Sequence, residues 1–384
     1  MRVLHLIDDP APHPGVVGRA DGVLHACRLL HGLDGHDHGV CIVGNRDLAE
    51  EAERVGLNVA ARVPATLRVP WMAWRALRRV VRHGRPPDVV HCWSPATLLL
   101  ARLAVGAGAP RCAALLDPPP PDADARRRAA ARCAGALVAA CNPAAREEWV
   151  SAGIDEGRVV VASPPVTPGE VEVTRRGAIR RRLGLSPVET AVLLVGDHPH
   201  ADGVRFVFLL GLLGVAGVRF TGVLPRGARQ FDRGVRYSTN GARHNRLIVS
   251  DLSESRLLPG MDAAVIDGGG IGPTSALAPR PAASALPIAR AHAVGVPVVA
   301  PAWADDERLY PREAAGGLLA INHALPELAR VLRPIVSDRG RRITLGRLVR
   351  ENLTGWRPGE LFVAQVGALW ARAARPGATR GGGV

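Results

Sequence analysis

The sequence predicts an α/β protein with two domains, each built on a parallel sheet. Short apolar segments alternate with helical segments from the first residue, and the same order restarts after a proline-rich break. An apolar segment, a glycine-bearing loop, a helix and a second apolar segment form a βαβ unit, which requires parallel strands. The chain of 384 residues is also too long for one compact core. We therefore expect two Rossmann-like domains that face each other across a cleft lined by strand carboxyl ends.

The first domain is expected over residues 1–165. It opens with an apolar strand at 2–7, a loop that contains Gly15, Gly18 and Gly22, and a helix that runs to residue 33. Its further strands are expected at 39–43, 58–60, 88–92, 112–116, 136–139 and 159–162. Its further helices are expected at 71–83, 96–105, 126–133 and 144–152.

The second domain is expected over residues 170–355. The run Ser163–Thr174 is rich in proline and breaks the alternation, so it marks the boundary. Strands are then expected at 191–196, 218–223, 247–249, 263–266, 296–299 and 317–321, with long helices at 324–336 and 340–352. A last helix, within 358–375, follows Pro358.

Composition limits the possible partners. All 49 basic residues are arginine, and the net charge is +14. A complete lack of lysine indicates codon bias as much as an acidic partner, and 4% aromatic residues are too few for a base-stacking surface, so no nucleic acid is expected. No apolar run reaches the ~20 residues that span a bilayer, and the start resembles a buried strand, so a cytoplasmic protein is expected.

The sequence offers candidate metal ligands in two places, and neither pattern predicts a site. His198 and His200 flank a proline in the loop from Asp197 to Asp202, and His36 and His38 lie in a helix-to-strand turn. Two histidines separated by one residue rarely bind a metal without a third ligand from elsewhere. The six cysteines form no C-x-x-C pair and are expected to be small buried side chains. No metal and no cofactor is expected.

Several segments, in order along nearly the whole chain, resemble the family 4 glycosyltransferases. They are DGVLHACRLLHGLDGHDHGVCIVG, PDVVHCWSP, ALVAACNPAAREEWVSAGIDEGRVVVASPPV, RRLGLSPVETAVLLVG, MDAAVIDGG, LPIARAHAVGVPVVAP and the tail from SDRGRR to GALW. The resemblance implies the GT-B architecture of two Rossmann-like domains, with the last helix packed back on the first domain. It also implies metal-independent, retaining transfer of a hexose from a nucleoside-diphosphate sugar to a carbohydrate or lipid-linked acceptor.

The resemblance places a donor diphosphate beside the start of the helix at 286–293. Ser284 is expected to cap that helix, and free amides there, with Arg290 and Gly196, would contact the diphosphate. The acceptor is expected near Gly15, Gly18 and Gly22. Further candidates for the cleft are His91, Asp117 and Asp197.

The expected site lacks the side chains that the family uses, so it is a degenerate active site with no assignable catalytic residue. The family's two glutamates fall at Ala282 and Arg290, and its histidine falls at Leu116. Its phosphate-binding arginine and lysine fall at Asp197 and Asp202, where anions would repel a diphosphate. The sequence therefore leaves two hypotheses open: a glycosyltransferase, or an inactive relative that acts as a binding or scaffolding subunit.

The helix at 71–83 also leaves two interpretations open. Trp71, Trp74, Leu77 and Val81 recur near helical spacing, with arginines between them. This pattern is typical of a core helix with a solvated arginine face, and equally of an interfacial helix on the inner face of an anionic membrane.

Overall fold

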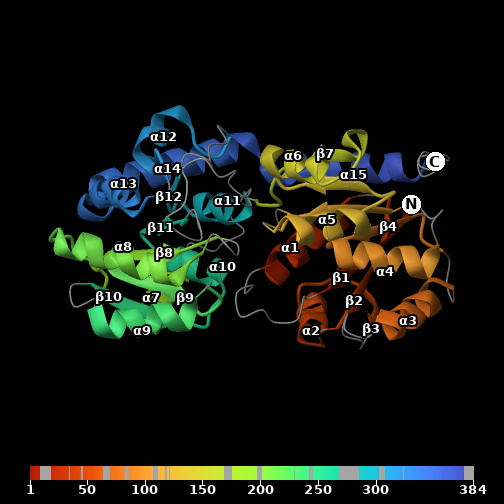
Figure 1. Ribbon diagram of the computed structural model, residues 1–384, viewed down its shortest axis with the longest axis horizontal. Helices are drawn as coiled ribbons and strands as arrows, with labels where there is room; N and C mark the ends of the chain where they lie inside the picture. The colour runs from red at the N-terminus through yellow and green to blue at the C-terminus, as the bar shows by residue number, and fades with distance from the viewer. Residues whose placement is uncertain are drawn as a thin grey trace. The chain divides into compact units, whose positions relative to one another are not determined.

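The computed structural model contains two α/β units (Figure 1). It describes residues 1–375 except for 9–18, 34, 45, 64–69, 83–85, 107–110, 117–118, 121, 168–174, 197–200, 229, 242–244, 268–284, 302–307 and 323. The first unit holds Arg19–Pro165 together with the start of the chain and the helix after Pro358. The second unit holds Val166–Pro358.

The first unit is a seven-stranded sheet with the order β3-β2-β1-β4-β5-β6-β7. The strands are β1 (Arg2–Asp8), β2 (Asp37–Val43), β3 (Val59–Val63), β4 (Val89–Cys92), β5 (Arg111–Leu115), β6 (Leu137–Ala140) and β7 (Val159–Val161). All their pairings are parallel. The strand order reverses between β1 and β4, which is the switch point of a Rossmann-like sheet.

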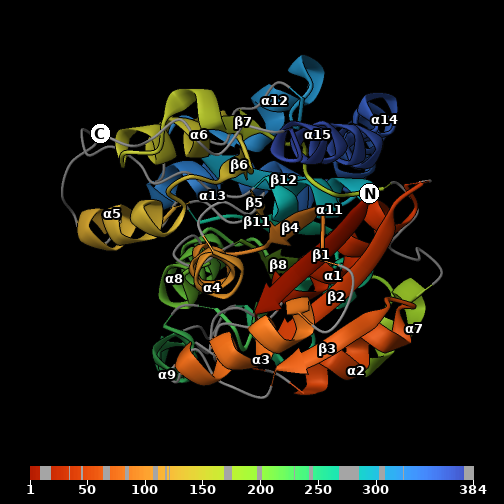
Figure 2. The same ribbon diagram turned by 90° about the vertical axis from the view of Figure 1, so that its right-hand side faces the viewer.

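Helices lie on both faces of this sheet (Figure 2). They are α1 (Arg19–His31), α2 (Arg46–Arg54), α3 (Pro70–Arg82), α4 (Pro95–Val105), α5 (Ala123–Arg132), α6 (Pro143–Ser151) and α15 (Pro358–Ala373). Because both faces are covered, the strands are apolar on both sides: β4, β5 and β6 are buried at every position. The predicted alternation of strands and helices is thereby confirmed in this unit.

The last helix, α15, completes the core of the first unit. Its side chains Phe362 and Trp370 are fully buried. The Ser163 amide donates to Oε1 of Gln365 at 2.7 Å, and Arg372 donates to the carbonyl of Gly157 at 2.5 Å. The helix before it, α14 (Arg339–Trp356), ends at Arg357 in the left-handed conformation, and Pro358 begins α15.

The second unit is a six-stranded sheet with the order β10-β9-β8-β11-β12-β13. The strands are β8 (Ala191–Leu194), β9 (Thr221–Pro225), β10 (Arg246–Ser250), β11 (Ala263–Val265), β12 (Val298–Pro301) and β13 (Leu319–Ala320), again all parallel. The helices are α7 (Arg176–Arg182), α8 (Gly203–Val215), α9 (Phe231–Gly241), α10 (Glu254–Leu257), α11 (Leu286–Ala293), α12 (Arg312–Leu318), α13 (Leu325–Ser337) and α14. The two parallel-sheet α/β domains expected from the sequence are confirmed.

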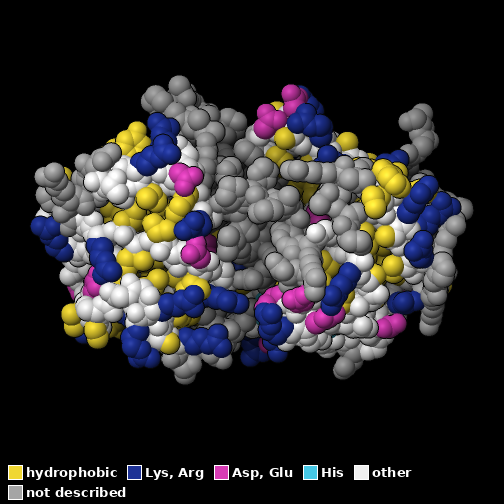
Figure 3. Space-filling view, turned by 90° about the horizontal axis from the view of Figure 1, so that it is seen from below, with side chains coloured by type: hydrophobic (Ala, Val, Ile, Leu, Met, Phe, Trp, Pro, Cys, Tyr) yellow, Lys and Arg dark blue, Asp and Glu magenta, His cyan; other side chains and the backbone are white. Residues whose placement is uncertain are grey.

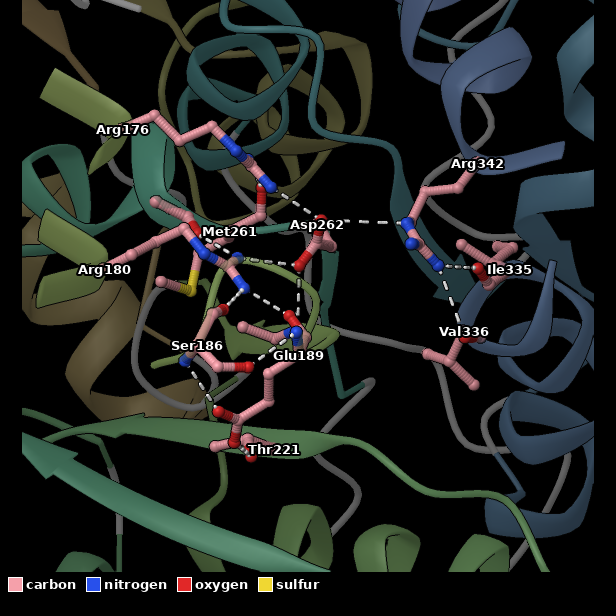
Figure 4. Close-up of polar contacts among 12 residues, drawn as sticks. Arg176, Arg180, Ser186, Glu189, Thr221, Met261, Asp262, Ile335, Val336 and Arg342 are labelled. Atoms are coloured by element: carbon pink, nitrogen blue, oxygen red, sulfur yellow. Dashed lines mark hydrogen bonds and ion pairs between the residues drawn. The ribbon is translucent and has the colours of Figure 1, made fainter. Parts of the chain in front are cut away.

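A buried cluster of arginines around Asp262 ties together the amino edge of the second sheet (Figure 4). Arg176 donates to Asp262 at 2.7 Å, Arg180 donates to it at 3.0 Å, and the Ala191 amide donates to it at 2.9 Å. Arg342 of α14 forms a longer ion pair with Asp262 at 3.8 Å. One carboxylate therefore joins α7, α14 and the starts of β8 and β11.

Arg180 makes the cluster rigid. Its side chain is only 6% exposed, and it also donates to the carbonyls of Gly260, Ser186 and Glu189. A buried guanidinium needs acceptors for its donors, and here one carboxylate and three carbonyls accept from its two terminal nitrogens. Of the four hydrogen-bond acceptors described for Arg180, only the Asp262 carboxylate carries a negative charge.

All six cysteines are free and buried, as expected from the sequence. Burial raises the pKa of the Cys41 thiol to about 12, so this side chain stays protonated at neutral pH. No helix in the described part of the chain is long and apolar enough to cross a membrane.

Replacement of Asp262 should strongly destabilise the second unit. The Asp262→Ala variant would leave Arg180 and Arg342 charged and without their carboxylate, which costs about 3–5 kcal/mol for a buried pair. Urea unfolding followed by circular dichroism measures this loss. The control is Asp251→Ala, whose partner Arg226 is exposed, and it should cost at most about 1 kcal/mol. Equal losses in the two variants would contradict the role of the cluster.

Candidate functional site

The switch point of the second sheet lies between β8 and β11, which are neighbours there. Ligands of open parallel sheets bind outside the strand carboxyl ends at such a point. The residues that follow the two strands are Gly196, two positions after β8, and Asp267, two positions after β11. The side chains and amides around these two residues therefore define the candidate site.

Gly196 is held by a carboxylate. Its amide donates to Oε2 of Glu254 at 3.2 Å. Its φ of 130° lies in the region that side-chain-bearing residues avoid, so a glycine is required at this bend. Glu254 begins α10, directly after the loop that follows β10. The turn after β8 and the start of α10 are thus joined at the carboxyl edge.

Burial raises the pKa of Glu254 to about 7, although the Gly196 amide and the positive charge of Arg290 both act to lower it. A carboxyl group in this state exists in both protonation states near neutral pH. Such a perturbed acid at a sheet edge is a common property of binding and catalytic sites. Glu254 was missed in the sequence, where it stands in a short polar segment without a motif.

Arg290 of α11 supplies the positive charge of this group. Arg290 is 6% exposed, and the positive charge of its guanidinium acts to lower the pKa of Glu254. The Gly196 amide thus donates to the Glu254 carboxylate, and the charge of Arg290 acts on the same group. The two residues come from different segments, after β8 and within α11.

A second charge pair lies at the same edge. Nε of Arg205 in α8 donates to both carboxylate oxygens of Asp267, each at 2.7 Å. The Asp267 side chain is 4% exposed and that of Arg205 24%. In the sequence, Asp267 stands near the end of the segment MDAAVIDGG and has no motif of its own. The edge therefore holds two arginines, each beside a carboxylate.

Asp202 has a different role from the one that the family resemblance implies. It caps α8: its Oδ1 accepts from the amides of Val204 and Arg205 at 2.9 and 3.2 Å, and Oδ2 accepts from Gln230 at 2.6 Å. The amides at the helix start and an amide side chain therefore stabilise the carboxylate by hydrogen bonds. Asp202 thereby occupies the amides that could hold an external anion.

The start of α11 differs from the expected phosphate site. Its N-cap is Ala285, which has no side-chain cap bond, so the prediction that Ser284 caps this helix is wrong. Ser284 itself lies outside the described residues. Ala285, Leu286 and all other residues of α11 are buried, and hence this helix start is not open in the structure.

The remaining candidates fall in two groups. Asp117, Asp197, Gly15 and Gly18 lie outside the described residues, while Gly22 is a buried residue of α1. His91 of β4, another candidate for the cleft, is fully buried. Its ring packs on His5 and Trp93 with centroid separations of 5.1 and 4.6 Å. Leu116, at the place of the family's histidine, is 7% exposed.

Comparison with known proteins identifies the fold class. Residues 22–170 match the model of Glycosyltransferase Family 4. In structure, the chain resembles Anabaena HepE in complex with UDP and glucose, with a TM-score of 0.71, 15% identity, and coverage of 97% of this chain and 99% of that one. It also resembles a glycosyltransferase from Rickettsia africae, with a TM-score of 0.67 and 13% identity. That similarity covers 97% of this chain and 98% of the other. No curated protein matches in sequence.

The chain thus has the GT-B fold, and the resemblance to family 4 glycosyltransferases is confirmed. The matched segment spans most of the first unit. The same fold occurs in a UDP-GlcNAc 2-epimerase from Neisseria meningitidis bound to UDP-GlcNAc, with a TM-score of 0.60 and 12% identity. The similarity covers 96% of this chain and 100% of the epimerase. Fold alone therefore does not fix the reaction.

The raised pKa of Glu254 predicts a pH-dependent stability. Between about pH 4.5 and 7 the folded chain keeps a proton that the unfolded chain has lost, so the unfolding free energy falls as pH rises through this window. Glu254→Gln removes this contribution. The difference in unfolding free energy between the two proteins should change by on the order of 3 kcal/mol between pH 4.5 and 8. Parallel pH curves in denaturant titrations would contradict the assignment.

Proposed function

We propose that the protein binds a nucleoside-diphosphate sugar on its second unit and transfers the hexose, with retention and without a metal, to a carbohydrate or lipid-linked acceptor. The observation that carries the proposal is the meeting of Gly196, Glu254 and Arg290 at the sheet's switch point. The match to Glycosyltransferase Family 4 and the likeness to HepE bound to UDP support it.

The charges at this edge suit a diphosphate under one condition. Arg290 provides a cation, but the Glu254 carboxylate beside it would repel a phosphate group. Because the pKa of Glu254 is about 7, the group can take up a proton near neutral pH. A protonated Glu254 no longer repels the diphosphate and can donate a hydrogen bond to a phosphate oxygen. Diphosphate binding and proton uptake should therefore be coupled.

The other parts of the reaction rest on the family resemblance. Gly15, Gly18 and Gly22 are the proposed acceptor side, and Ser284 and Gly196 are proposed to contact the diphosphate with Arg290. Asp117 and Asp197 stay candidates for the cleft. We assign no catalytic residue, since neither Leu116 nor Arg290 has the chemistry of the family residue that it replaces.

A second candidate function is an inactive relative that binds or organises partners. Three described features favour it: Asp202 occupies the start of α8, Asp267 engages Arg205, and Leu116 replaces a histidine. The hydrogen bonds of Asp202 and Asp267 use groups that could otherwise serve a donor sugar. The two candidates differ in whether a nucleoside diphosphate binds and in whether its sugar is transferred.

Nucleotide binding can be tested by thermal unfolding with UDP, GDP and ADP and their sugars. One diphosphate should stabilise the protein, by about 2.7 kcal/mol at a concentration a hundred times its Kd. Arg290→Gln should weaken that binding by roughly thirtyfold, because a charged hydrogen bond is worth about 2 kcal/mol. Arg330→Gln, on an exposed part of α13, is the matched control and should bind normally.

Glu254→Gln distinguishes this site from a merely structural one. It should tighten diphosphate binding above pH 7 and abolish the coupling between binding and proton uptake, which calorimetry in buffers of different ionisation enthalpy measures. Stabilisation by a nucleotide without release of its sugar would favour the inactive relative. No response to any nucleotide would contradict both the donor site and the transfer.

We also propose that the first unit associates with the inner face of an anionic membrane. In α3, Ala73 and Leu77 face the core, whereas Trp71 and Met72 are 55% and 48% exposed. Leu103 of the adjoining α4 is also exposed, at 53%. Nε1 of Trp74 donates to the Leu103 carbonyl at 2.7 Å, which joins the two helices.

The basic side chains fit the same interpretation. The guanidinium of Arg75 stacks over the Trp71 ring at 5.2 Å, which places positive charge beside exposed apolar surface. Aromatic and basic residues together are typical of helices at a charged lipid interface. Elsewhere, arginines are interspersed with acidic residues over the face shown in Figure 3, rather than gathered in one basic stripe.

Membrane association can be measured by sedimentation with liposomes at low salt. The protein should sediment with vesicles that contain phosphatidylglycerol and remain in solution with neutral phosphatidylcholine vesicles. Trp71→Ala should lower the partition coefficient roughly tenfold, as expected when about 1.5 kcal/mol of apolar burial is lost. The control is Ile343→Ala, which removes an exposed apolar side chain from α14 of the second unit. Equal effects of both variants would contradict a specific surface.

A further inference from the structure

Four histidines gather inside the first unit, away from the proposed donor site. His5 lies in the middle of β1, His38 near the start of β2, and His31 is the last residue of α1. In the sheet, Val3 is opposite His38, and His5 follows two positions later on the same face as Val3. His91 of β4 is opposite His5. The cluster therefore lies toward the amino edge of the sheet, whereas ligands of such sheets bind at the carboxyl edge.

Three of these rings have the separations of metal ligands. One ring nitrogen from each of His5, His31 and His38 lies within 4.8 Å of the others. Nε2 of His5 and Nδ1 of His38 are 3.1 Å apart and share a hydrogen bond. Two imidazole nitrogens that bind a tetrahedral zinc ion at 2.0–2.1 Å are about 3.3 Å from each other. The present spacing is thus close to that of two ligands on one ion.

Several ring nitrogens of the cluster are buried without compensation. Nδ1 of His5, Nε2 of His31 and Nε2 of His38 have no hydrogen-bond partner in the described part of the chain. The residues His5 and His38 are 0% and 6% exposed. A buried polar atom left without a partner costs about 1–3 kcal/mol, so a cluster of this kind needs a physical reason.

Imidazole binds a metal ion through a ring nitrogen in its neutral form. The indole of Trp370 packs on His5 and His38 at 5.8 and 5.5 Å and closes the cluster on the side of α15.

We propose that His5, His31 and His38 bind a divalent transition-metal ion of the zinc type. Three neutral imidazoles suit this class of ion, and they leave a fourth position for water. The ion would join the end of α1 to β1 and β2, so its effect is on the stability of the first unit. The site does not depend on the proposed glycosyl transfer, since the two lie in different units.

The test is titration of the full-length chain, purified without a histidine tag and treated with EDTA, with ZnCl2 in a calorimeter. We expect about one equivalent of tight binding and a melting temperature that rises with zinc and falls again with EDTA. A Co2+ titration followed by visible absorption reports directly whether the ion has nitrogen ligands in a tetrahedral arrangement.

Matched variants locate the site. His31→Gln should weaken zinc binding at least tenfold, and because this residue is only half-buried the variant should fold. His38→Gln should do the same. His25→Gln is the control: it changes a histidine of the same helix, outside the three-histidine group, and should bind zinc normally. Absence of tight binding by the folded wild-type chain, or unchanged binding by folded His31→Gln, would overturn the proposal.

Discussion

In a parallel sheet all strands end at the same edge, and every strand pairing in the described part of this chain is parallel. Where helices cover both faces of a sheet, its strands are largely apolar, and charged side chains gather at the two edges. In the second unit the amino edge holds Asp262 with its arginines, and the carboxyl edge holds Glu254 and Asp267. The charges of the Asp262 cluster and those of the candidate site therefore lie at opposite ends of the strands.

Much of this fold could be predicted, because buried parallel strands are continuous apolar runs. The segments at β1, β4 and β8 are of this kind, and each is bounded by polar or glycine-containing segments. The prediction was weaker where that contrast is absent. The helix α8 is apolar on nearly every side, so it shows no clear helical period.

The site could be predicted only in part, because it is made of residues far apart in the chain. Gly196 and Arg290 were accessible through a resemblance, but Glu254 lies 58 residues from Gly196 in a segment with no motif. Nor could the sequence distinguish a helix cap from an unpaired anion at Asp202, since the partner Gln230 is 28 residues away. His38 shows the same limit: its neighbours His5 and His31 are supplied by the fold.

The position of α15 has a consequence for how the chain is made. This helix is synthesised after the whole second unit, yet it carries Phe362 and Trp370 into the core of the unit that is synthesised first. While the chain grows on the ribosome, the early unit must wait as an incomplete intermediate until the later one has emerged. A nascent chain that stops at Trp356 would hold a whole second unit and a first unit with an open core, the state that chaperones recognise.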